Sequence, residues 1–128
     1  MKPVFQTKFN SEGNCFAACV ASLLACDINE VPFLGKEESW EDYELRLNDF
    51  LKQRYQLFVY VVSYDLEQYE NFFKVDLKDT YYIVAGDAER GFFHSVVYKN
   101  GKLAHDPHPS GVGLLNVQTV YLFQKVFL

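Results

Sequence analysis

Two hydrophobic patterns divide the chain, and their order along the sequence constrains the fold more than any other feature. Apolar residues recur at helical spacing in the first 54 residues, whereas short runs rich in aromatic and β-branched residues dominate the rest. Helices that come first and strands that come after favour an α+β fold with an antiparallel sheet. With 128 residues, the chain fits one domain spanning 1–128.

The same patterns predict the individual elements. Helices are expected at residues 14–26 and 40–54, the second beginning after Ser39 because an acid three residues later completes a weaker form of the capping box. A short helix is expected at residues 65–73. Strands are expected at residues 55–63, 80–85, 92–98 and 102–105, with one or two more within 117–128. The sheet should therefore have about four to six strands, the range of an ordinary sheet.

The first predicted helix begins with a cysteine. Its apolar face is formed by Phe16, Cys19, Val20, Leu23 and Leu24. We expect the side chain of Asn14 to cap this helix, which leaves Cys15 on the first turn. Unpaired backbone amides and the positive end of the helix dipole favour an anion there, and the thiolate is the nucleophilic form of cysteine. Taken alone, a cysteine at a helix start is more often a small buried core residue.

The second half contains a hairpin whose turn lies at Asn100-Gly101, and two registers are open to it. A two-residue turn pairs Lys99 with Lys102. Counting outward from that pair places His94 opposite Pro107. This register opposes two like charges directly, which disfavours it.

In the other register a three-residue loop has Gly101 in the left-handed conformation and pairs Tyr98 with Lys102. Counting outward then places His94 directly opposite Asp106. Opposed side chains share a face of the sheet with Cβ atoms about 4.5–5.5 Å apart. We therefore expect the three-residue loop and a His94–Asp106 hydrogen bond, with an ordinary surface hairpin as the alternative.

A cysteine at a helix start, a strand histidine and an aspartate on the neighbouring strand are the three residue types that nucleophilic catalysis by a thiol requires. Cys15 would attack a carbonyl, His94 would hold and deliver the proton, and Asp106 would fix the tautomer of the imidazole. A developing oxyanion also needs donors. The backbone amide that follows Asn14 supplies one, and the side-chain amide of Gln6 is a candidate for the second.

These residues resemble the papain-like cysteine peptidase superfamily. Among proteins of similar size, they are similar to the leader-peptide peptidases of bacterial ABC exporters and to small bacterial or phage relatives. The resemblance rests on Gln6, on Gly13-Asn14-Cys15 opening a helix, and on His94 followed by Asp106-Pro107. It implies a papain-like fold, with the Cys helix packed on an antiparallel sheet that carries His94 and Asp106. It implies a catalytic triad of Cys15, His94 and Asp106 and an oxyanion hole at Gln6 and Asn14.

The implied activity is that of a cysteine peptidase or amidase, a thiol hydrolase that cleaves a peptide or protein substrate through an acyl-enzyme. Two details differ from the superfamily pattern. Gln6 lies nine residues before Cys15, where six is usual, and Phe16 stands in place of a tryptophan. The alternatives are an acyl transferase that uses the same site and a catalytically silent relative that works as a protein-binding module.

A zinc module is a further alternative, and its ligands would be Cys15, Cys19, His105 and His108. The Cys-x3-Cys spacing is uncommon in structural zinc sites, so we expect no metal and no cofactor. Cys19 and Cys26 are expected in the core. His108 is expected to be exposed or to contact substrate near the site.

Charge and cysteine usage restrict the partners and the compartment. A formal net charge of -5 without a basic cluster argues against a nucleic-acid partner. No apolar run is long enough for a membrane span, and no signal peptide follows Met1. Three cysteines within one short segment make no disulfide framework. We therefore expect a cytoplasmic protein without a membrane partner.

Overall fold

The computed structural model describes residues 1–9, 13–62 and 77–126, and this part of the chain folds as helices packed on one sheet. Its elements are α1 (Cys15–Leu24), the 3-10 helix η2 (Ile28–Glu30), α2 (Trp40–Tyr55), β1 (Leu57–Val62), β2 (Tyr81–Asp87), β3 (Phe93–Lys99), β4 (Lys102–His105) and β5 (Thr119–Lys125). The five strands form one antiparallel sheet in the order β1-β5-β2-β3-β4. This confirms the predicted α+β class. The helix predicted at residues 65–73 lies outside the described residues.

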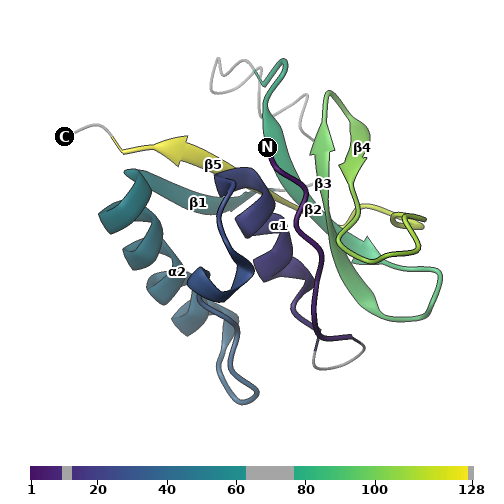
Figure 1. Ribbon diagram of the computed structural model, residues 1–128, viewed down its shortest axis with the longest axis horizontal. Coiled ribbons are helices and arrows are strands. Elements are labelled where there is room, and N and C mark those ends of the chain that lie inside the picture. Colours follow the sequence, from purple (N-terminus) through teal and green to yellow (C-terminus); the bar gives the residue numbers. More distant parts are fainter. Residues whose placement is uncertain (10–12, 63–76, 127–128) are drawn as a thin grey trace.

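Both α-helices pack on the same face of the sheet (Figure 1). Side chains alternate along each strand, so Val59, Ile83 and Val97 point to the helices and are almost fully buried. Their neighbours Val84 and Val96 are equally buried in a second cluster on the other face. The run of apolar residues in β2 and β3 reflects this burial on both faces.

The helix boundaries follow local capping chemistry. The hydroxyl of Ser39 accepts a hydrogen bond from the amide of Asp42 at 3.1 Å, which confirms the predicted start of α2. Helix α1 is shorter than predicted, because Ala25 adopts a left-handed conformation (φ 56°) and ends it at Leu24. Cys26 therefore lies after the helix rather than on it.

The N-terminal arm joins α1 to the far edge of the sheet (Figure 1). The amide of Val4 donates to the hydroxyl of Ser22 in α1 at 2.9 Å, and its carbonyl accepts from Nε2 of His105 at 2.7 Å. Further along the arm, the amide of Gln6 donates to the carbonyl of Pro107 at 3.0 Å. The arm thus fixes α1 relative to the end of β4.

Candidate active site

Cys15 is the first residue of α1, and its side chain is half-buried at the edge of the sheet. The carbonyl of Asn14 accepts the first intrahelical bond, from the amide of Ala18 at 3.0 Å. The amides of the first turn have no partner within the helix, and they carry the positive end of its dipole. The helix therefore places the thiol where its ionised form is stabilised.

His94 and Asp106 form a buried pair beside this thiol. Nε2 of His94, the second residue of β3, lies 2.7 Å from Oδ1 of Asp106, and both side chains are at most 3% exposed. Asp106 also accepts hydrogen bonds from the amides of His108 at 2.9 Å and Gly113 at 2.8 Å. With Nε2 donating to Asp106, Nδ1 is the ring nitrogen left to face Cys15, and His94 and Cys15 are close enough for each to shift the pKa of the other. The expected His94–Asp106 contact is confirmed.

The hairpin reaches this contact by a different register from the one that we expected. Asn100 and Gly101 have positive φ values of 52° and 75°, as a two-residue type I′ turn requires, and Lys99 pairs with Lys102. The expected three-residue loop is wrong. The like charges are tolerated because Nζ of Lys99 lies over the ring of Tyr81, 4.9 Å from its centroid.

A β-bulge then shifts the register of β3 and β4 by one residue. Tyr98 pairs with Leu103 and Val97 pairs with His105, so one residue of β4 is inserted between the two pairs. One step beyond the last pair, Asp106 falls opposite Val96, which lies two residues from His94 on the same side of the strand. Diagonal neighbours lie within reach of long side chains. Without the bulge, Asp106 would face the opposite side of the sheet from His94.

The electrostatics favour a thiolate and an imidazolium at this pair. Burial by itself raises the pKa of Cys15, but hydrogen bonds from His94 and Ser95 and the charge of His94 outweigh it and lower that pKa from its usual 9.0. Burial by itself lowers the pKa of His94, but hydrogen bonds to Asp106 and Cys15 outweigh it and raise that pKa to about 9. Both shifts stabilise the charged form of the group.

The other two cysteines have the opposite environment. Cys19 is fully buried in α1, and burial raises its pKa well above 9.0. The pKa of Cys26 is also raised, mainly by burial. Both are free thiols. Cys19 lies in the core, as predicted, whereas the prediction is wrong for Cys26, which is partly buried and packs against the core from outside the helix. Of the three cysteines, Cys15 is therefore the one whose thiolate form is stabilised.

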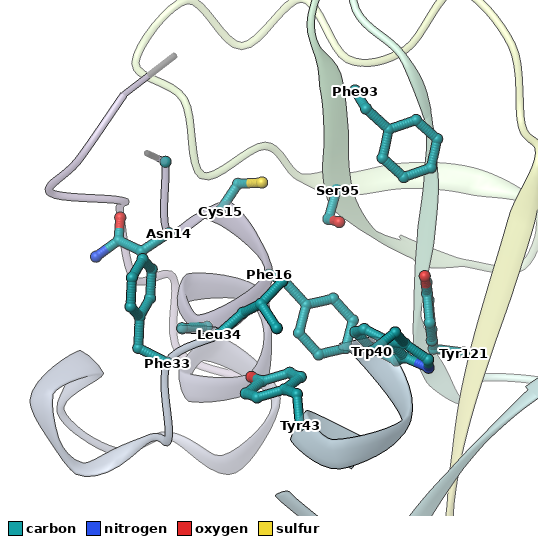
Figure 2. A pocket seen from close by; sticks show the side chains of 12 residues that line it. Asn14, Cys15, Phe16, Phe33, Leu34, Trp40, Tyr43, Phe93, Ser95 and Tyr121 are labelled. Carbon is teal, nitrogen blue, oxygen red and sulfur yellow. The ribbon is translucent and has the colours of Figure 1, made fainter. Parts of the chain in front are cut away.

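Ser95 belongs to the site, and sequence reasoning missed it. Its backbone amide and its hydroxyl lie on the side of Cys15, and both help to lower the pKa of the thiol. Figure 2 shows its hydroxyl on β3 and the sulfur of Cys15 on facing sides of a cavity. Ser95 is 5% exposed. The sequence feature that could have indicated this role is a small hydroxyl residue directly after the strand histidine.

We expect Ser95→Ala to raise the pKa of Cys15, because the variant loses the hydroxyl donor and keeps the backbone donor. The alkylation rate of Cys15 at pH 6 should fall about threefold to tenfold, the effect of one ordinary hydrogen bond. Peptide-resolved mass spectrometry of iodoacetamide labelling measures it. Ser95→Thr keeps a hydroxyl and should restore most of the rate; an equal loss in both variants would assign the effect to packing.

Gln6 lies at the site, as predicted. It is 7% exposed and lines a cavity together with Cys15 and His94. Its Nε2 donates to the carbonyl of Lys8 at 2.9 Å, and its Oε1 is buried without a hydrogen-bond partner among the described residues. Since Nε2 carries two hydrogens, one remains for a group bound in the cavity.

Asn14 has a different role from the predicted helix cap. Its Oδ1 accepts hydrogen bonds from the amides of Thr7 and Lys8, both at 3.0 Å, and its Nδ2 donates to the hydroxyl of Thr7 at 2.9 Å. No side-chain hydrogen bond caps α1. The predicted cap is wrong because the side chain binds the N-terminal arm instead. That contact helps to hold the arm, and with it Gln6, beside Cys15.

Two cavities meet at Cys15. One, of about 200 Å³, is drawn in Figure 2; Phe16, Phe33, Leu34, Trp40, Tyr43 and Tyr121 form its apolar lining, and Ser95 lies at its edge. The other, of about 360 Å³, is lined on its polar side by Gln6, Arg90, His94 and His108. The thiol therefore borders two cavities whose linings differ in chemistry.

The zinc alternative finds no support in the geometry. His105 donates to the backbone of the arm, and Cys19 is enclosed in the core. Across residues 1–9, 13–62 and 77–126, no three His, Cys, Asp or Glu side chains gather in a way that would hold a metal ion. The described residues do not bring the alternative set of Cys15, Cys19, His105 and His108 together as a metal site.

Comparison of the chain with protein-family models, with curated proteins and with solved structures finds no match. Within the described ranges, no helix has the length and apolar character needed to cross a membrane. What the site does must therefore follow from its own geometry.

Proposed function

We propose that this protein is a papain-like cysteine hydrolase that cleaves a peptide or amide bond with Cys15, His94 and Asp106. The observation that carries the proposal is the buried His94–Asp106 hydrogen bond of 2.7 Å, with the other side of the imidazole on a thiol at a helix start. Each side chain has a partner that suits its role in thiol catalysis.

In the first half of the reaction, the thiolate of Cys15 attacks the carbonyl carbon and forms a C–S bond. His94 gives its proton to the leaving nitrogen as the C–N bond breaks. In the second half, His94 takes a proton from water, and the oxygen attacks the acyl-enzyme. The C–S bond breaks, the acid leaves, and the thiolate and imidazolium are restored.

The oxyanion of each tetrahedral intermediate needs donors that are already in place. The backbone amide of Cys15, at the start of α1, is one, and Nε2 of Gln6 is the second. Support for Gln6 comes from its burial in the cavity that also contains Cys15 and from its tether to the carbonyl of Pro107 at 3.0 Å. The side chain of Asn14 contributes by holding the arm, since its Oδ1 accepts from the amides of Thr7 and Lys8 and its Nδ2 donates to the hydroxyl of Thr7.

The test is the pH dependence of iodoacetamide labelling, which needs no substrate. Cys15 should label near pH 6, well before Cys26, because an unshifted thiol of pKa 9.0 is only about one part in a thousand thiolate at that pH. The rate should change little as the pH rises toward about 9, where His94 loses its proton. Peptide-resolved mass spectrometry follows each cysteine separately.

His94→Ala should abolish the early labelling of Cys15 and leave Cys26 unchanged, and Cys15→Ala should remove the labelled peptide. Circular dichroism shows whether each variant is folded, and His94→Gln is a second variant in case His94→Ala does not fold. If Cys15 labels like an ordinary thiol in a folded wild-type protein, the enzyme proposal fails and the binding-module alternative takes its place.

A further inference from the structure

The two cavities beside Cys15 differ in chemistry. We name the first, formed by Phe16, Phe33, Leu34, Trp40, Tyr43 and Tyr121, the aromatic pocket. We name the polar side of the second, formed by Gln6, Arg90, His94 and His108, the cationic mouth. The described residues that line the two cavities include no aspartate or glutamate. A substrate can therefore bind in one orientation better than in the other.

The position of His94 decides which part of the substrate enters which cavity. The leaving nitrogen must receive a proton from His94, so the leaving part lies on the side of the imidazole. His94 lines the cationic mouth and does not line the aromatic pocket. The acyl part, which stays attached to Cys15, therefore points toward the aromatic pocket.

The aromatic pocket suits a large apolar side chain. The ring of Phe16 contacts Trp40 and Tyr121 edge-on, with centroids 5.3 and 4.9 Å apart, so the base of the pocket is packed. The hydroxyl of Tyr43 is engaged with the carbonyl of Pro32 at 2.8 Å. An apolar cavity of about 150 Å³ binds benzene. The volume of about 200 Å³ here therefore has room for an aromatic or large aliphatic side chain.

The cationic mouth suits an anion. Arg90 forms no ion pair with any carboxylate in the described ranges, and its Nη1 donates to the hydroxyl of Ser110 at 3.3 Å. The amide of Ser110 donates to Nδ1 of His108 at 3.0 Å, so the remaining hydrogen of that imidazole is on Nε2. Burial and the charge of Arg90 lower the pKa of His108, and the nearby imidazolium of His94 adds to this effect. The charge of His94 is paired with Asp106 and the thiolate of Cys15, whereas the charge of Arg90 is balanced by no carboxylate among the described residues that line this cavity.

We propose that the substrate is a peptide whose acyl part presents a large apolar side chain to the aromatic pocket and whose leaving part carries a carboxylate that binds at Arg90 and His108. The inference rests on the proposed hydrolase function and adds the substrate class. A peptide cut within a residue or two of its C-terminus combines both features.

The experiment uses acetylated peptides with either Phe-Phe or Ala-Ala before the scissile bond. The leaving part is Gly or Gly-Gly, each as the free acid and as the carboxamide. We expect kcat/KM to be about tenfold or more higher for Phe-Phe, as burial of a large apolar side chain predicts. For one of the two leaving parts, Gly or Gly-Gly, kcat/KM should be about fivefold higher for the free acid than for the carboxamide. This is the upper range for an exposed ion pair. Salt should weaken only this second preference.

Variants separate the two contributions. Arg90→Gln should reduce the ratio of free acid to carboxamide toward one. The matched control is Arg54→Gln, whose arginine pairs with Glu30 at 3.4 Å, away from the cavities. Phe33→Ala should reduce the Phe-Phe preference, because Phe33 lines the aromatic pocket and not the second cavity, and as Phe33 is 38% exposed the fold should tolerate the change.

The outcomes distinguish this inference from the proposed function. Equal rates for all peptides, or cleavage of none of them while Cys15 still labels early and in a His94-dependent way, would overturn the substrate class and leave the hydrolase proposal standing. An unreactive Cys15 would overturn both. A preference for the carboxamide would contradict the proposed binding of a carboxylate. A preference for the free acid that persists in Arg90→Gln would show that Arg90 does not bind it.

Discussion

Asp106→Ala is expected to reduce peptide hydrolysis roughly thousandfold or more, because the imidazole loses the group that fixes its tautomer and stabilises its charge. The same variant should lose about 3 kcal/mol of unfolding free energy. Three donors lose their acceptor: Nε2 of His94 and the amides of His108 and Gly113. Urea denaturation and steady-state kinetics measure the two effects on one preparation.

The pH dependence of that stability difference has a definite sign. Burial by itself raises the pKa of Asp106, but the hydrogen bond from His94 and the two backbone donors outweigh it and lower the pKa from 3.8. A group with a lowered pKa stabilises the folded state above its unfolded pKa, and the contribution is lost as the pH falls through the folded value. The difference between wild type and Asp106→Ala should therefore narrow below about pH 3.8.

Asp106→Asn is the matched control, since it keeps the shape and one acceptor oxygen but removes the charge. The pKa of His94 should fall below about 9, as an NMR titration of the imidazole would measure, while most of the stability remains. A fully active Asp106→Asn or Asp106→Ala variant would contradict the role given to this carboxylate.

Gly86→Ala is expected to destabilise the fold by about 3 kcal/mol. Gly86 lies in β2 opposite His94, and a Cβ there would lie 2.0 Å from the carbonyl oxygen of Asn116. That contact is with backbone, so a side-chain rotation cannot relieve it. The chain around Asn116 must move away from β2. Hydrogen bonds from the amides of Leu115 and Gln118 to β2 would break or lengthen. Thermal unfolding should show a melting temperature lower by on the order of 10 °C.

Gly35→Ala is the control for this substitution. A Cβ at Gly35 meets only the side chain of Glu38, at 3.3 Å, and the residue has no left-handed conformation to lose. Its unfolding free energy should change by about 0.5 kcal/mol or less, as at most surface positions. If Gly86→Ala were equally mild, the close approach of residue 116 to β2 would not exist in solution.

Much of the fold followed from local patterns. The apolar periodicity placed α1 and α2 to within two residues at most boundaries, and Ser39 marked the start of α2 because capping is a short-range interaction. The end of α1 was misplaced because the residue that stops it, Ala25, carries no glycine or proline signal. The role of Asn14 was misjudged because its partners, Thr7 and Lys8, lie on an arm whose path no local pattern encodes.

The sequence by itself determined the α+β class and the cysteine at a helix start, and it predicted which histidine and aspartate meet, although from a register that the structure does not have. Each of these depends on residue type and short spacing. Only the tertiary structure decided how they meet. A two-residue turn and a β-bulge, rather than the three-residue loop, bring Asp106 to His94. The packing of α1 against β3 brings Ser95 to Cys15. Strand register and helix packing are set by long-range contacts, which local preferences of the chain do not record.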